Sequence, residues 1–256
     1  MSEMGAGKAD YGNWVSSRLV LVPALLAVLL GVVAFLLLPV LSVLATIFLL
    51  CGLYFAYARY MFSPRGGDIQ ARVQALVLDH LAGWDGAGKV LDIGCGSAPL
   101  AIEIAKAYPQ AEVVGVDYWS RGWEYSVGVC ERNANIEGVG GRIAFERASA
   151  VSLPYADEAF DVVVSNLVFH NIRDVEDNRE LVKEALRVLK KGSRFVLQDL
   201  FLWKLVYGET DDLLAAIESW GVETVAFVDT SSSDFIPRAL KLPFMLGTVG
   251  IIHGRK

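Results

Sequence analysis

A glycine-containing segment holds the residues best suited to binding a ligand. Gly94 and Gly96 follow an apolar stretch, residues 89–93, which predicts a buried strand with Asp92 as the charge inside it. Pro99 suits the first turn of a helix, where its missing N–H is not needed. A strand, a glycine turn and a helix N-terminus together present free N–H groups and the positive end of a helix dipole to a ligand.

A second candidate is Asp117, at the end of the next expected strand, residues 112–116. A carboxylate in this place can accept hydrogen bonds from both hydroxyl groups of a ribose. The glycine spacing G-x-G-x-x-G of dinucleotide-binding proteins is incomplete, because Pro99 takes the third glycine position. The two motifs therefore predict a ligand that contains adenosine, and they favour one other than a nicotinamide dinucleotide.

Two further motifs follow in the chain, L-P-Y before F-D-V-V-V-S-N at residues 153–166, and L-R-V-L-K-K-G at residues 186–192. Together with V-L-D-I-G-C-G-S they resemble the motifs of class I S-adenosylmethionine (SAM)-dependent methyltransferases, D-x-G-x-G-x-G, L-P-F followed by F-D-x-V, and L-R-V-L-K-P-G-G. The resemblance covers residues 89–256. Ala98, Lys191 and Ser193 depart from the family pattern.

The resemblance implies an α/β fold: a Rossmann-like, seven-stranded methyltransferase sheet with helices on both faces and only the last strand antiparallel. The alternation of apolar stretches and helical patterns agrees with a parallel sheet. After the first strand we expect strands at residues 112–116, 142–146, 160–165, 194–197, 222–228 and 247–253. We expect helices at residues 69–81, 99–108, 123–137, 177–190 and 210–220.

The resemblance also implies a SAM site at the carboxyl ends of the first strands. Asp92, Gly94 and Gly96 would face the methionine part, Asp117 the ribose, and Tyr118 or Trp119 the adenine. Ser149 stands where the family often has an Asp that contacts the adenine amino group. The expected cofactor-binding residues are Asp92, Gly94, Cys95, Gly96, Asp117, Tyr118, Trp119, Ser149, Ala150 and Asn166.

His170 and Asp199 are the candidate catalytic residues. Methyl transfer from a sulfonium is an in-line displacement, and it needs a base where the acceptor must lose a proton. His170 follows Asn166 at the carboxyl end of an expected strand, and histidine titrates near neutral pH. We expect His170 to be this base, with a packing or capping role as the alternative. Asp199 ends the following strand and is expected to orient His170 or to bind substrate.

One part of the chain is far more apolar than the rest. Residues 19–58 contain no charged side chain, and as one helix they would be about 60 Å long, twice the hydrocarbon core of a bilayer. Because Pro39 interrupts the run, two transmembrane spans fit better, near residues 19–38 and 40–58. Basic residues flank both outer ends, Lys8 and Arg18 before and Arg59 and Arg65 after, so both ends should face the cytoplasm.

We therefore expect four segments: a loose N-terminal tail (1–17), a transmembrane helical hairpin (18–60), a linker and N-terminal helix (61–88) and a SAM-dependent methyltransferase domain (89–256). The chain should be an integral membrane protein with both termini and the catalytic domain in the cytoplasm. The net charge of −6 indicates no nucleic-acid surface. The three cysteines lack C-x-x-C spacing, so neither disulfides nor a metal site are predicted.

The leading hypothesis is a membrane-anchored methyltransferase that acts on a lipid, a prenylated quinone or another membrane-borne small molecule. An alternative is the same enzyme acting on a soluble small molecule or protein, with the hairpin fixing only its location. Another is a catalytically idle SAM-binding module, which the residues Ala98 and Ser149 would allow. The partners expected are the bilayer, a small-molecule or lipid substrate and no nucleic acid; the sequence leaves the oligomeric state open.

Overall fold

The computed structural model describes residues 7–119 and 125–256 of the 256. The chain forms two compact units. One is the chain up to Gly12 together with Gln74–Lys256, and the other is Asn13–Val73. The first part of the expected helix 123–137 lies outside the described residues. The two units are described separately below.

The unit Asn13–Val73 is built on a helical hairpin. Helix α1 (Ser17–Leu36) begins after Ser16, whose hydroxyl accepts a hydrogen bond from the Arg18 N–H, and α2 (Leu41–Phe62) follows a short turn. Both helices are long and apolar enough to cross a membrane. Most of their large side chains are exposed, and Phe35 reaches 89%. The turn takes residues from both expected spans, because Pro39 cannot continue α1.

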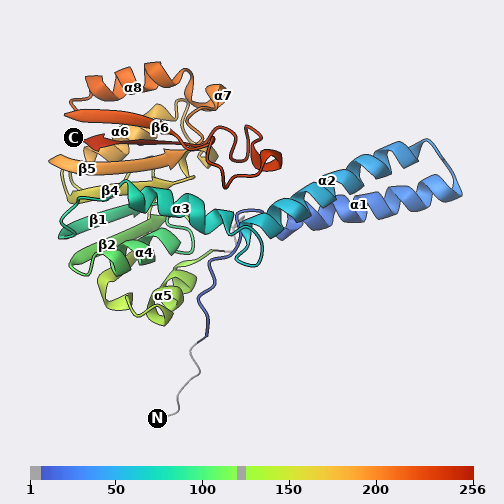
Figure 1. Ribbon diagram of the computed structural model, residues 1–256, viewed down its shortest axis with the longest axis horizontal. Coiled ribbons are helices and arrows are strands. Elements are labelled where there is room, and N and C mark those ends of the chain that lie inside the picture. Colours follow the sequence, from blue (N-terminus) through green and yellow to red (C-terminus); the bar gives the residue numbers. More distant parts are fainter. Residues whose placement is uncertain (1–6, 120–124) are drawn as a thin grey trace, which may run out of the picture. The chain divides into compact units, whose positions relative to one another are not determined.

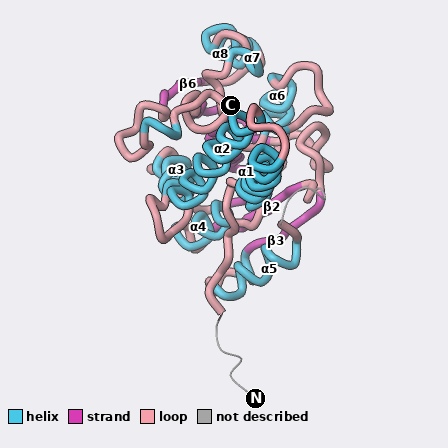
Figure 2. The backbone as a smooth tube through the Cα atoms, turned by 90° about the vertical axis from the view of Figure 1, so that its right-hand side faces the viewer, coloured by secondary structure: helices cyan, strands magenta, loops and turns pink. Residues whose placement is uncertain are grey.

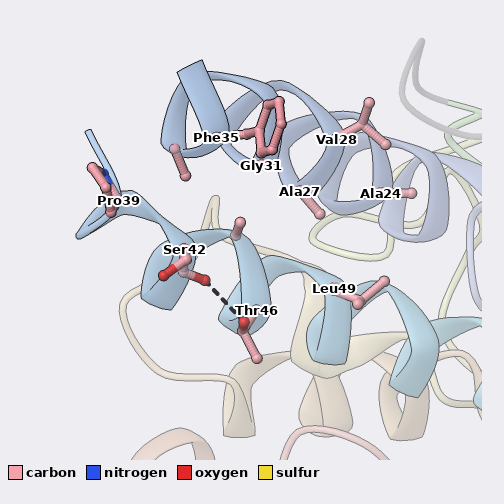
Figure 3. Close-up of a pocket in the computed structure, with 11 residues that line it drawn as sticks. Ala24, Ala27, Val28, Gly31, Phe35, Pro39, Ser42, Thr46 and Leu49 are labelled. Carbon is pink, nitrogen blue, oxygen red and sulfur yellow. Dashed lines mark hydrogen bonds between the residues drawn. The ribbon is translucent and has the colours of Figure 1, made fainter. Parts of the chain in front are cut away.

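A groove of about 600 Å³ lies between the two helices of the hairpin (Figure 3). The side chains that line it are mostly small and apolar. The hydroxyl of Thr46 donates a hydrogen bond to the Ser42 carbonyl oxygen at 2.8 Å. The helix backbones approach each other at Gly52, where a Cβ would lie 3.4 Å from the Ala24 backbone nitrogen, as small residues allow in membrane helix pairs. Helix α3 (Ile69–Asp79) begins in this unit and continues in the other.

The larger unit is organised around a seven-stranded sheet with the order β3-β2-β1-β4-β5-β7-β6 in the described residues (Figure 1). Strand β7 is antiparallel to both of its neighbours, and the other pairs are parallel, which confirms the expected topology. The strands are β1 (Gly88–Ile93), β2 (Ala111–Asp117), β3 (Ile143–Arg147), β4 (Phe160–Asn166), β5 (Leu189–Asp199), β6 (Thr224–Asp229) and β7 (Gly250–Arg255).

Apolar side chains alternate to the two faces of the sheet, and each face packs against its own helices. On one face Val90, Val162 and Val196 meet α4 (Pro99–Ala107), α5 (Val127–Ile136) and the end of α3. On the other face Leu91, Val163 and Leu197 meet α6 (Arg179–Arg187) and α8 (Thr210–Ser219). Figure 2 shows α3 and α4 on one side and α6 on the other. Shorter helices are α7 (Lys204–Tyr207), η1 (Gly140–Arg142), η2 (Phe169–Asn171) and η3 (Arg238–Leu240).

Several element boundaries differ from the sequence prediction by a few residues, and two of them have a clear physical cause. Helix α6 ends at Arg187 rather than at residue 190, because Leu189 already pairs with Phe160 of β4 and starts β5. Helix α5 begins at Val127 rather than at residue 123, because the Ser126 hydroxyl caps it by accepting a hydrogen bond from the Val129 N–H. In both places a tertiary or capping contact overrides the helical pattern.

Candidate active site

The glycine turn at the end of β1 is fixed by its backbone. The N–H groups of Gly94 and Cys95 donate to the Val116 carbonyl oxygen at 2.7 and 3.0 Å. Gly94 has φ +74°, and a Cβ built on it would collide with the side chain of Val168. Only glycine fits such a left-handed position at this close an approach. The turn therefore brings the end of β1 against the loop that follows β4.

Ala98 takes a left-handed conformation, φ +70°, directly before Pro99 opens α4. This is the place of the family's last glycine, and the alanine carries the strain that a Cβ causes there. The Ala98 side chain is fully buried in the core below the turn. Its methyl group is accommodated by the core.

Asp92 is a buried carboxylate beside the turn. Its Oδ2 has no hydrogen-bond partner among the described residues. Burial raises the pKa of Asp92, the negative charge of Asp117 raises it further, and the backbone N–H of Ala101 lowers it, with a result of about 7. An unpartnered, buried carboxylate oxygen of this kind is complementary to a cationic group of a ligand.

Asp117 ends β2 and holds the turn from the other side. One carboxylate oxygen accepts a hydrogen bond from the Gly96 N–H at 3.0 Å, and the other accepts from the Trp119 N–H at 2.8 Å. The indole of Trp119 donates to the Gly96 carbonyl oxygen at 2.9 Å, so its ring is fixed to the turn. Tyr118 is exposed, with the Arg147 guanidinium 4.8 Å from its ring centroid.

The remaining predicted cofactor residues lie at neighbouring strand ends. Ser149 and Ala150 are half-buried after β3, where the Ser149 hydroxyl accepts a hydrogen bond from the Val151 N–H at 3.3 Å. Asn166 ends β4 with a buried Oδ1 that has no partner in the described part of the chain. Cys95 is turned into the core, where burial and a contact with Cys130 raise its pKa, so only its backbone faces the turn.

His170 and Asp199 come together at the carboxyl ends of β4 and β5. The His170 Nδ1 lies 2.6 Å from Asp199 Oδ1, and the imidazole is 16% exposed. Asp199 is fully buried and also accepts hydrogen bonds from the N–H groups of Phe169 and Leu200, both at 2.7 Å. These bonds fix the carboxylate, which in turn keeps a proton on Nδ1 and leaves Nε2 as the titrating atom.

Burial lowers the pKa of His170, but the charge and the hydrogen bond of Asp199 raise it, and the balance stays above the ordinary value. Asp199 is too deeply buried to meet a substrate, so of the two expected roles the geometry favours orienting His170. His80 is half-buried, with its ring 4.8 Å from that of His253.

An N-terminal segment at the site was not anticipated, because we expected a loose tail up to residue 17. Asp10 and Asn133 are joined by two hydrogen bonds, Asp10 N–H to Oδ1 at 3.0 Å and Nδ2 to the Asp10 carbonyl oxygen at 2.8 Å. The Ser97 hydroxyl donates to the Tyr11 carbonyl oxygen at 2.8 Å. Asn133 also donates to the Ser97 carbonyl oxygen at 3.1 Å. The sequence carries no motif for this contact, which becomes evident only from the burial of the polar Asn133 side chain on α5.

The residues present fit the cofactor that the sequence motifs imply. SAM carries an ammonium group, which suits the unpartnered oxygen of Asp92, and a ribose, which suits the half-buried carboxylate of Asp117. Among residues 7–119 and 125–256, no three His, Cys, Asp or Glu side chains form a metal site.

Comparison with known proteins agrees with this geometry. A family model described as "Methyltransferase domain" matches residues 85–233. The ubiquinone/menaquinone biosynthesis C-methyltransferase UbiE of Geobacter sulfurreducens is 36% identical over 115 residues, which are 44% of this chain and 42% of that protein. The demethylmenaquinone methyltransferase of Thermus thermophilus is 32% identical over 132 residues, 52% of this chain and 54% of that protein.

The chain spans about half the length of the curated relatives it matches. A solved geranyl diphosphate methyltransferase in complex with SAM has the same fold, with a TM-score of 0.57 at 14% identity over 78% of this chain and 89% of that chain. The family model covers more than half of the residues, and the strand order is the expected one. The chain therefore belongs to the methyltransferase domain family and has the fold of a SAM-binding methyltransferase.

Proposed function

We propose that this enzyme is anchored in a membrane by α1 and α2 and methylates a membrane-borne small molecule, such as a lipid or a prenylated quinone. The observation that carries this proposal is the exposed apolar surface of the hairpin, on which Leu29 and Leu50 are 59% and 60% exposed. A soluble protein rarely leaves so large a contiguous apolar surface in water. A bilayer covers it without further partners.

The flanking charges and the relatives support the same proposal. Arg18 stands in the first turn of α1 and Arg59 in the last turn of α2, so the basic residues lie at the same end of the hairpin. By the positive-inside rule, this end and the catalytic unit belong in the cytoplasm. Both curated relatives described above are named as methyltransferases of quinone biosynthesis. The substrate class is carried over from their names.

In the proposed mechanism, bound SAM supplies the electrophilic methyl group. Asp92 would pair with its ammonium group, and Asp117 would accept hydrogen bonds from its ribose while holding Gly96 in place. Trp119 or Tyr118 would cover the adenine, near Ser149 and Ala150. These residues would orient the cofactor toward the acceptor and exclude water from the reacting atoms.

His170 Nε2 would take the proton that the acceptor loses when it displaces the methyl group from the sulfonium sulfur of SAM, which leaves as the neutral thioether S-adenosylhomocysteine. Asp199 keeps the other nitrogen protonated and stabilises the imidazolium that results, because its buried charge lies 2.6 Å away. Asp199 is therefore a positioning residue and His170 the residue that touches the substrate.

The anchoring is tested by placing charge on the exposed face of the hairpin. The double variant Leu29→Arg and Leu50→Arg should move the protein from alkali-resistant membranes to the soluble or aggregated fraction, because arginine at the bilayer centre is costly. The matched control, Leu29→Ala with Leu50→Ala, keeps the surface apolar and should remain in the membrane. If the arginine variant also resists alkaline extraction, the hairpin does not span the bilayer.

The substrate class is tested with the full chain in vesicles made from a total membrane lipid extract. Labelled SAM is added, and labelled products are separated into lipid and aqueous phases and identified by mass spectrometry. We expect the label in the lipid phase. Label found only in soluble molecules or in protein would overturn the proposal and leave the hairpin a role in location alone.

A further inference from the structure

A row of polar side chains crosses the carboxyl ends of β1, β4 and β5 on one face of the sheet. Asn166 is paired with Gln198 in the parallel register of β4 and β5, so both side chains point to the same face. Asp92 is paired with Val164, two residues before Asn166, and shares this face. It is the face on which Val164 and Val196 join the core with α4 and α5.

Each side chain of the row has at least one buried polar atom without a hydrogen-bond partner among the described residues. Gln198 is 1% exposed, and neither its Nε2 nor its Oε1 has a partner among the described residues. The same is true of Asn166 Oδ1 and Asp92 Oδ2. The backbone of Gln198 is satisfied, because its carbonyl oxygen accepts a hydrogen bond from the Leu167 N–H at 2.8 Å. Within the described part of the chain, only its side-chain amide lacks partners. A buried amide without partners costs about 1–3 kcal/mol, and an apolar residue would avoid that cost.

We propose that Gln198 and Asn166 form the polar part of the acceptor-binding site, a proposal that rests on the function proposed above. A neutral primary amide offers two N–H donors and an acceptor oxygen, and it holds neither a strong anion nor a strong cation. The ligand group that satisfies it is an uncharged oxygen function, a hydroxyl or carbonyl group, as on a hydroxylated aromatic ring. The carboxylates of Asp92 and Asp117 disfavour an anionic acceptor nearby.

The arrangement separates the two ligands along the sheet edge. Asp92 at the end of β1 is suited to the ammonium group of SAM, and Gln198, two strands away, is suited to the acceptor, with Asn166 between them. Gln198 and Asp199 are consecutive on β5, so their side chains leave the strand on opposite faces. Replacing Gln198 therefore leaves the bond between His170 and Asp199 in place.

The test compares Gln198→Leu with the wild-type full chain in detergent micelles. The probe is a total membrane lipid extract at increasing concentration with labelled SAM. We expect the apparent KM for the extract to rise at least ten-fold, with the Kd for SAM unchanged by calorimetry. The melting temperature should stay the same or rise, because the variant removes an unsatisfied buried amide.

Thr230→Val is the matched control, because Thr230 is also buried with an unpartnered hydroxyl but follows β6, outside the row. It should leave the KM unchanged. If Gln198→Leu keeps the wild-type KM, or if both variants raise it equally, Gln198 does not recognise the acceptor, while the function proposed above stands. If the wild type itself labels nothing in the extract, that function fails and this inference fails with it.

Discussion

The carboxylate of Asp117 accepts a hydrogen bond from the backbone N–H of Gly96 at 3.0 Å, across the ends of two neighbouring strands. The residue expected to bind the ribose is thus also a support of the glycine turn. Its second oxygen accepts from the Trp119 N–H. Substitutions at Asp117 therefore act on the cofactor both directly and through the shape of the turn.

Asp117→Ala should weaken SAM binding by about 1.5–3 kcal/mol, because it removes charge-assisted hydrogen bonds to the ligand and to the turn. Calorimetric titration of the folded variant measures this change. Glu112→Ala is the control, since Glu112 is exposed at the other end of the same strand and should bind SAM as the wild type does. Unchanged affinity in Asp117→Ala would remove Asp117 from the site.

Asp92→Asn should stabilise the ligand-free protein at pH 8 and weaken SAM binding. The pKa of Asp92 rises from an ordinary value of about 3.9 to about 7 on folding. The stability that a raised pKa contributes is complete below pH 4 and is lost as the pH rises through 7, because the buried group must then ionise. The asparagine does not ionise, so we expect it to gain at least about 1 kcal/mol over the wild type at pH 8 and little at pH 4.

Thermal or urea unfolding of Asp92→Asn and wild type at both pH values provides the measurement. A gain that is equal at pH 4 and pH 8 would mean that folding does not shift the pKa of Asp92, and that its burial does not control its charge.

His170→Ala should retain SAM affinity and lose about 100-fold or more in turnover, because it removes the base.

In the wild type, activity should rise with pH as His170 loses its proton, with a midpoint above the ordinary value near 6.5. Asp199→Asn removes the charge that raises the pKa, so the midpoint should move to lower pH. Initial rates between pH 5 and 9 measure both effects. A pH profile that Asp199→Asn does not move would show that the pair does not control the rate.

Asn133→Leu should lower the free energy of unfolding by about 1–3 kcal/mol, because it removes hydrogen bonds that tie Asp10 and Ser97 to α5. The segment before the hairpin should then be cleaved faster by added protease. Glu131→Ala, an exposed change on the same helix, is the control. Equal cleavage rates in the two variants would mean that Asn133 does not hold the segment.

The sequence was sufficient for the fold because each element carried its own local signal. Glycine, proline and the apolar periodicity marked β1, α4 and β4 close to their observed ends. The largest errors in the predicted boundaries lie where pairing with a residue distant in the sequence sets the end of an element. Helical propensity continues through Leu189, yet pairing with Phe160 makes that residue part of β5. Local patterns contain no information about such pairing.

The sequence indicated individual residues of the candidate site, but not the hydrogen bonds that hold them in place. The positions of His170 and Asp199 after successive strands suggested that they meet, but the backbone donors that fix Asp199 come from η2 and from Leu200, which follows β5. Gln198 was overlooked because a single glutamine in an apolar strand carries no motif. Its significance depends on the face it occupies and on partners that it lacks, and both follow only from the register of the sheet.

The hairpin unit begins after Gly12 and ends at Val73, so it is inserted into the catalytic unit instead of being attached at one end. A chain is synthesised from its N-terminus, and both apolar helices therefore exist well before Asn133 has been made. Asp10 and Tyr11 can form their hydrogen bonds only after Asn133 and Ser97, which follow the hairpin in the sequence, have been synthesised. With the proposed anchoring, the catalytic unit completes its folding after the hairpin has entered the bilayer. A chain shortened to begin after α2 would lack the N-terminal segment that belongs to the catalytic unit.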